Sequence, residues 1–72
     1  MAAKITIKFR KGDKKFFKKI LDIANRNNAD IIMADDSTEY NILTFYIEDK
    51  TDSIYFKSNI GILPNVEIIK EN

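Results

Sequence analysis

The stretch "DDSTE" groups its acidic side chains in the way that a catalytic or metal site could. The chain has no histidine and no cysteine, which removes the usual general base, the thiolate nucleophile and nitrogen or sulfur metal ligands. Asp35, Asp36 and Glu39 could hold a hard cation through oxygen, but the stretch lacks the ligand alternation of a calcium loop. We therefore expect a solvated turn, and a non-enzymatic protein with no metal and no cofactor.

Basic side chains offer a second kind of chemistry, and they are crowded into the first quarter of the chain. Residues 1–19 contain eight lysines and arginines and one acid, whereas residues 20–72 contain four basic and ten acidic residues. A basic cluster attracts acidic protein surfaces and phosphates. The predicted binding patch consists of Lys8, Arg10, Lys11, Lys14, Lys15, Lys18 and Lys19.

Four of these lysines stand where a helix disfavours them. Lys14 and Lys15 would occupy the first turn of a predicted helix, where the positive end of the helix dipole costs about 0.3–1 kcal/mol for each cation. Lys18 and Lys19 follow four residues later, and each like-charged pair costs about 0.2–0.5 kcal/mol. Two interpretations stay open: a solvated helix face, or a binding surface kept at a small loss of stability.

The elements that carry the patch follow from hydrophobic periodicity. Residues 4–10 alternate strictly and predict a strand that buries Ile5, Ile7 and Phe9. Residues 13–27 predict an amphipathic helix, because a projection at about 100° per residue separates every apolar side chain from the charged ones. Asp13 is the expected N-cap and Asn27-Asn28 the expected end.

The rest of the chain predicts three strands and one more helix. Residues 29–36 predict a strand, although the pattern does not define its buried face. Residues 37–39 predict a polar turn, and residues 40–48 predict a third strand. Residues 52–60 favour a helix capped by Thr51 or Asp52, with Gly61 as its C′ residue and Pro64 beyond. A hairpin through "EDKTD" is the alternative, because Ile54-Tyr55-Phe56 favours strands. The last strand is residues 65–70.

The order β-α-β-β-α-β predicts a single α+β domain over residues 1–72. We expect a ferredoxin-like, four-stranded antiparallel sheet with two helices on one face and the other face open. Tyr40, Ile42, Tyr46 and Ile69 would lie on the open face. An apolar row there is typical of an interface, so we expect a homodimer.

Two segments, "KGDKKFFKKILDIANRNNADII" and "IGILPNVEII", resemble the ACT-type regulatory domains of the ferredoxin-like group. The resemblance implies a domain that senses a small ligand at the turn before its first helix. That family usually has an Asp-x-Pro-Gly-type turn there, whereas this chain has Arg10-Lys11-Gly12-Asp13. We therefore assign no ligand-binding residue of that family to this chain.

These patterns together predict a small protein-interaction or regulatory module of the cytoplasm, whose partner is a protein with an acidic surface. A nucleic-acid-binding protein is the alternative, because Tyr40 and Tyr46 would lie beside Lys8 and Arg10. Against it, the acidic remainder of the chain would repel phosphate. An ACT-like ligand sensor is the third possibility. No apolar run approaches the roughly 20 residues of a membrane span, so we expect no membrane partner.

Overall fold

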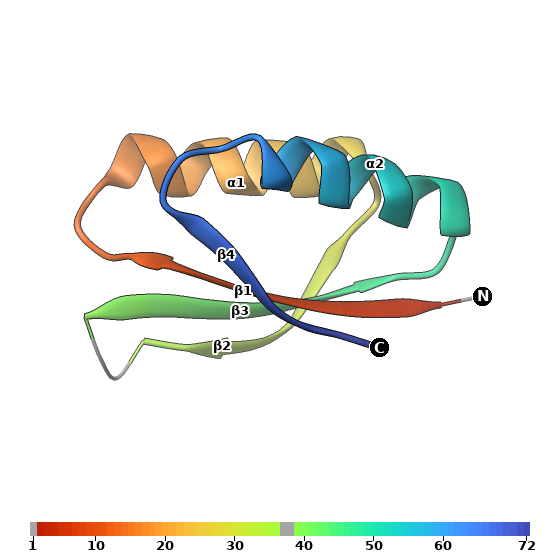
Figure 1. The fold of residues 1–72 in the computed structure, drawn as a ribbon, viewed down its shortest axis with the longest axis horizontal. Helices are drawn as coiled ribbons and strands as arrows, with labels where there is room; N and C mark the ends of the chain where they lie inside the picture. The colour runs from red at the N-terminus through yellow and green to blue at the C-terminus, as the bar shows by residue number, and fades with distance from the viewer. Residues whose placement is uncertain (1, 37–38) are drawn as a thin grey trace.

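The computed structural model of the protein describes residues 2–36 and 39–72. The elements follow the predicted order: β1 (Ala3–Arg10), α1 (Lys14–Arg26), β2 (Asp30–Asp35), β3 (Tyr40–Ile47), α2 (Lys50–Gly61) and β4 (Val66–Glu71). The strands form one antiparallel sheet in the order β2-β3-β1-β4. Both helices cover the same face of the sheet (Figure 1). The predicted ferredoxin-like α+β fold is confirmed.

The hydrophobic core lies between the sheet and the two helices. Alternate residues of β1 and β3 point into it and are almost fully buried: Ile5, Ile7, Phe9, Leu43, Phe45 and Ile47. The ring of Phe45 meets Phe56 of α2 with centroids 5.0 Å apart, and Phe9 meets Phe16 and Phe17 of α1. The alternation therefore leaves the remaining strand residues on the open face, as predicted.

Helix α1 begins and ends as the sequence predicts. The Asp13 carboxylate accepts a hydrogen bond from the backbone N–H of Phe16 at 3.0 Å, which satisfies one free donor of the first turn. At the other end, the Asn27 side chain donates to the carbonyl of Ile23 at 2.9 Å. Asn28 has φ 53°, in the left-handed region that closes a helix. The sheet-facing side buries Ile20, Ile23 and Ala24.

Helix α2 confirms the helical alternative for residues 52–60 and excludes the hairpin, but the predicted cap is wrong. The cap is Asp49, and the helix begins at Lys50. The Asp49 carboxylate accepts from the backbone N–H groups of Thr51 at 2.8 Å and Asp52 at 3.1 Å. The two predicted caps thus serve as donors to an acid that lies earlier in the chain.

The predicted role of Gly61 is also wrong. Gly61 is the last helical residue and Ile62 the C-cap, while the left-handed position is taken by Asn65, with φ 65°. A turn of four residues therefore separates the helix from β4, and it holds Leu63 against the core. Phe56, Ile60 and Leu63 share the core-facing side, as predicted.

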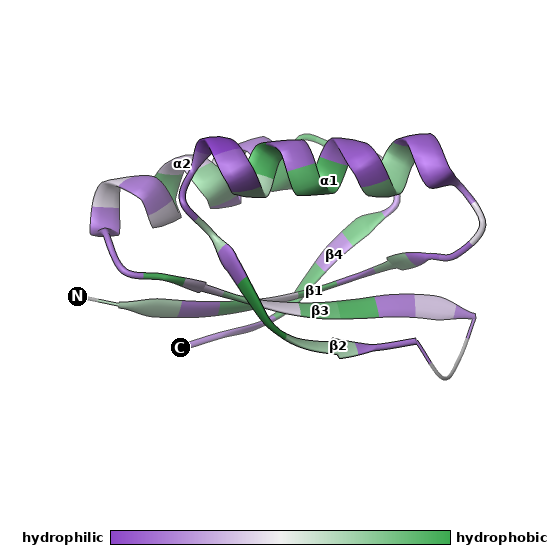
Figure 2. Cartoon of the chain, turned by 180° about the vertical axis from the view of Figure 1, so that it is seen from behind, coloured by the Kyte–Doolittle hydropathy of each residue, from purple (hydrophilic) through white to green (hydrophobic). Residues whose placement is uncertain are grey.

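Strand β2 forms an edge of the sheet and contains a bulge, which explains its lack of alternation. Ile31 pairs with Phe45 and Met33 with Thr44, so Ile32 is an extra residue between them. These three side chains of β2 – Ile31, Ile32 and Met33 – are 44%, 50% and 66% exposed, respectively. Figure 2 shows this strand hydrophobic in its middle and hydrophilic at its ends. The edge is therefore apolar in its middle and acidic at Asp30 and Asp35.

Candidate functional site

The fold divides the predicted basic patch between two sides of the molecule. Lys8 and Arg10 lie on the open face of the sheet, directly opposite Ile42 and Tyr40 of β3. The helical lysines lie on α1, which covers the other face (Figure 1). Lys11 stands in the turn that joins β1 to α1. Six of the seven residues therefore form two basic surfaces rather than one, and Lys11 lies in the turn between them.

The first surface, here called the α1 lysine face, consists of Lys14, Lys15, Lys18 and Lys19. All four are exposed, on the side of the helix opposite its buried residues. Within residues 2–36 and 39–72 none of them forms an ion pair. The first turn of α1 contains no acid, although Asp13 caps it. Four cations thus stand close together without a neutralising partner in the described part of the chain.

The second surface gathers basic side chains around Tyr40. The Lys8 Nζ lies 4.3 Å from the centroid of the Tyr40 ring, and the Arg10 Cζ lies 5.7 Å from it. Both distances suit cation–π attraction, which is worth about 0.5–1 kcal/mol at an exposed site. The predicted neighbourhood of Tyr40 with Lys8 and Arg10 is confirmed, and Tyr40 is already occupied by cations of its own chain. The same prediction for Tyr46 is wrong, because Tyr46 lies opposite Lys4 at the other end of β3.

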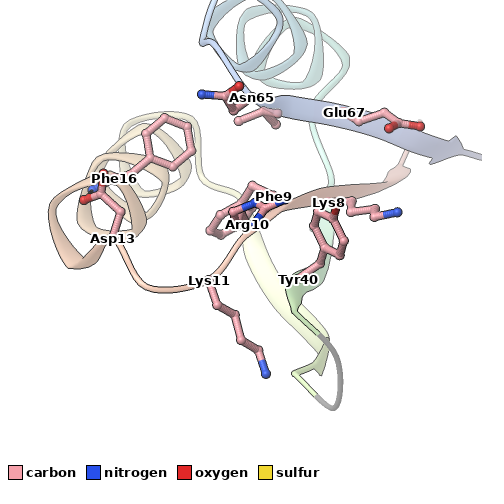
Figure 3. A pocket seen from close by; sticks show the side chains of 10 residues that line it. Lys8, Phe9, Arg10, Lys11, Asp13, Phe16, Tyr40, Asn65 and Glu67 are labelled. Carbon is pink, nitrogen blue, oxygen red and sulfur yellow. Dashed lines mark hydrogen bonds between the residues drawn. The ribbon is translucent and has the colours of Figure 1, made fainter.

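Beside Tyr40, a cleft of about 730 Å³ opens between the end of β1, the start of α1 and the turn before β4. Phe9, Phe16 and Val66 line its apolar part. Figure 3 shows Lys8, Arg10 and Tyr40 on one side of it, the N-cap Asp13 and Phe16 at the start of α1, and Asn65 and Glu67 from the last turn and strand. The cleft mixes both charge signs, so it presents no uniformly basic wall.

The open face of the sheet carries the predicted apolar row. Tyr40, Ile42 and Tyr46 are half-buried, because β1 and β2 flank them on both sides. Thr6 and Thr44 are joined across the strands by a hydrogen bond of 2.9 Å between their hydroxyls. Met33 extends the row onto β2, since it pairs with Thr44 and directly opposite residues share a face. Ile69, also expected there, is 43% exposed.

Sequence reasoning missed the apolar side chains that line the helical layer. Tyr55 of α2 and its C-cap Ile62 are 59% and 80% exposed and lie with Lys19 and Arg26 around a groove between the helices. The signal was present in the sequence, because the α2 segment has apolar residues all round rather than along one stripe. Which of them meet the basic residues depends on how the helices pack, so periodicity alone could not reveal it.

Three further observations concern metals, membranes and relatives. In the part of the chain that the structure describes, no three acidic side chains gather to hold a metal ion, and the predicted turn at 37–39 lies partly outside that part. Over residues 2–36 and 39–72, neither helix has the length and apolar character needed to cross a bilayer. No known family model matches the chain, and no curated protein matches it.

Proposed function

We propose that this protein is a non-enzymatic protein-interaction module that binds an acidic protein surface through the α1 lysine face. The observation that carries the proposal is the position of Lys14 and Lys15. Both are exposed in the first turn of α1, without an ion pair among the described residues. A helix chosen for stability alone would carry acids there. A stabilising acidic partner accounts for cations that the isolated helix disfavours.

A protein partner is favoured over nucleic acid by the distribution of charge. Residues 20–72 contain ten acids, and the chain as a whole has a net charge of only +1. Tyr40, the aromatic side chain nearest the basic residues of the sheet, already has Lys8 over its ring. A stacking site for a base would need that ring face. The α1 lysine face therefore suits carboxylates that lie together on the surface of another protein.

We also propose that the protein acts as a homodimer through the open face of the sheet. The row of Tyr40, Ile42 and Tyr46 provides apolar area, and Met33 extends it. The same face has a basic row on β1 next to the tyrosines of β3. A second copy packed face to face on the sheet would bury this apolar row against its own. Such a dimer leaves both α1 lysine faces outward.

Replacing Lys14 and Lys15 together with glutamate should stabilise the isolated protein. Acids at these positions interact favourably with the N-terminal end of the helix dipole, and the change also removes the repulsion with Lys18 and Lys19. The free energy of unfolding should rise by about 0.5–2 kcal/mol at low salt, and the gain should shrink as salt rises. Urea denaturation followed by circular dichroism at two salt concentrations measures this. An unchanged or lower stability would contradict the argument from the helix dipole.

The same double variant tests the function, because it should lose the partner while its fold becomes more stable. Immobilised wild-type protein should retain proteins from a host extract in a salt-sensitive manner, and the Lys14→Glu/Lys15→Glu variant should not. The matched control is Lys50→Glu/Lys70→Glu, which makes the same change in net charge away from the α1 lysine face. Equal retention by all three proteins would refute the proposal. Salt-sensitive binding of RNA or DNA that only the first variant loses would replace the protein partner with nucleic acid.

A further inference from the structure

The two helices leave a shallow groove of about 380 Å³ between them. Ile23 of α1 and Leu63, just beyond α2, line it with apolar surface, and both also contact the core. Tyr55 and Ile62 stand on the α2 side, and Lys19 and Arg26 on the α1 side. The groove is therefore apolar between the helices and basic along one border.

The apolar side chains of this groove are more exposed than the fold requires. Tyr55 and Ile62 are 59% and 80% exposed, although Phe56 and Ile60 on α2 already fill the core beside them. The spacing of seven residues puts the two exposed side chains on one side of α2, about two turns apart. Exposed apolar area that gathers in a groove is typical of a binding site for another chain.

The basic border shares Lys19 with the α1 lysine face and extends beyond it to Arg26. Lys15 and Lys19 are four residues apart and so lie on the same side of α1, and Arg26 continues that side by two further turns. The Arg26 Nε donates to the carbonyl of Asp22 at 3.4 Å, which holds the side chain along the helix. Neither Lys19 nor Arg26 forms an ion pair with any residue in 2–36 or 39–72. Both cations are therefore available to carboxylates from outside.

We infer that this groove binds a short acidic and apolar segment of the partner protein. Bulky apolar side chains of the segment pack against Tyr55 and Ile62, and its carboxylates meet Lys19 and Arg26. The inference rests on the proposed function, and it adds the chemistry of the segment that is recognised. Charge complementarity selects acids, and the exposed apolar pair distinguishes such a segment from a purely acidic surface.

The dimensions limit the segment to a short one. Lys19 and Arg26 are seven residues apart, which is about 10 Å along a helix. A partner helix covers that distance in about two turns, and an extended strand in about three residues. One or two apolar anchors with an acid on each flank would therefore fill the groove.

Selection from a random library of displayed nine-residue peptides tests the inference before the partner itself is identified. Peptides retained by the full chain should combine a bulky apolar residue with at least two acids. For the strongest selected peptide, the Tyr55→Ser/Ile62→Ser variant should bind at least tenfold more weakly. Ile54→Ser is the matched control, because Ile54 is another exposed apolar residue of α2 that does not line the groove. Nuclear magnetic resonance shifts should change at Lys19, Arg26, Tyr55 and Ile62.

The outcomes separate this inference from the proposed function. If Tyr55→Ser/Ile62→Ser binds the peptide as the wild type does while Lys14→Glu/Lys15→Glu does not, the groove is refuted and the lysine face stands. If the groove variant loses binding and a Lys19→Glu/Arg26→Glu variant does not, the groove binds apolar peptides and the acidic specificity is refuted. Selection of basic peptides, selection of none, or displacement of the peptide by single-stranded RNA would each overturn the inference.

Discussion

Replacing Phe56 with alanine should unfold a large part of the protein at room temperature. Phe56 has no exposed surface, and its ring packs against Phe45 in the centre of the sheet. A phenylalanine-to-alanine change at such a site costs about 3–5 kcal/mol through lost burial and the cavity it leaves. A domain of this size has rarely more than about 3–5 kcal/mol in total. Urea or thermal denaturation, followed by circular dichroism, measures the loss.

The neighbouring residue supplies the control for Phe56. Tyr55 is 59% exposed, so its replacement by alanine should change the free energy of unfolding by less than about 0.5 kcal/mol. We therefore expect two adjacent aromatic residues to have different roles. Phe56 stabilises the fold, and Tyr55 contributes to peptide binding. If the Phe56→Ala protein unfolded at the same temperature as the wild type, this would show that α2 does not close the core over Phe45.

Replacing Ile42 with lysine should convert the proposed dimer into the 8.4 kDa monomer. Ile42 is half-buried in the open face of the sheet, next to Lys8 on β1 and Asp35 on β2. A lysine can reach water there in the monomer, but a second sheet packed over it would have to bury the charge. Analytical ultracentrifugation at micromolar concentration should show the wild type at twice the mass of the variant.

Ile54→Lys is the matched control for this experiment. It makes the same substitution at an exposed residue of α2, away from the open sheet face, and the dimer should survive it. Circular dichroism should show that both variants remain folded. Wild-type protein that sediments only as a monomer, or an Ile42→Lys protein that remains a dimer, would remove the proposed interface.

The sequence predicted those parts of the fold in which local and tertiary preferences agree. Helix α1 has one apolar side, an N-cap at Asp13 and a left-handed asparagine at its end, so its bounds were right to within a residue. Strands β1 and β3 alternate regularly because both are central and have one buried face. Each of these features is encoded within a few residues of where it acts.

The parts that could not be predicted depend on distant contacts. The bulge at Ile32 shifts the register of β2, so no single alternation could describe which of its side chains lie on the open face. The cap at Asp49 was missed because "EDKTD" is equally typical of a turn. The groove beside Tyr55 and Ile62 exists only because α2 packs beside α1. Packing, rather than composition, brings these side chains together with Lys19 and Arg26.

The acids that flank the apolar middle of β2 should disfavour cross-β pairing of two copies along this edge. An edge strand with exposed Ile31, Ile32 and Met33 is a template on which another copy could add its own edge. If the β2 strands of two copies paired antiparallel about Ile32 and Met33, Asp30 of each copy would lie opposite Asp35 of the other. Like charges directly opposite each other destabilise such a pair. The carboxylates thus act as gatekeepers against growth of the sheet along this edge.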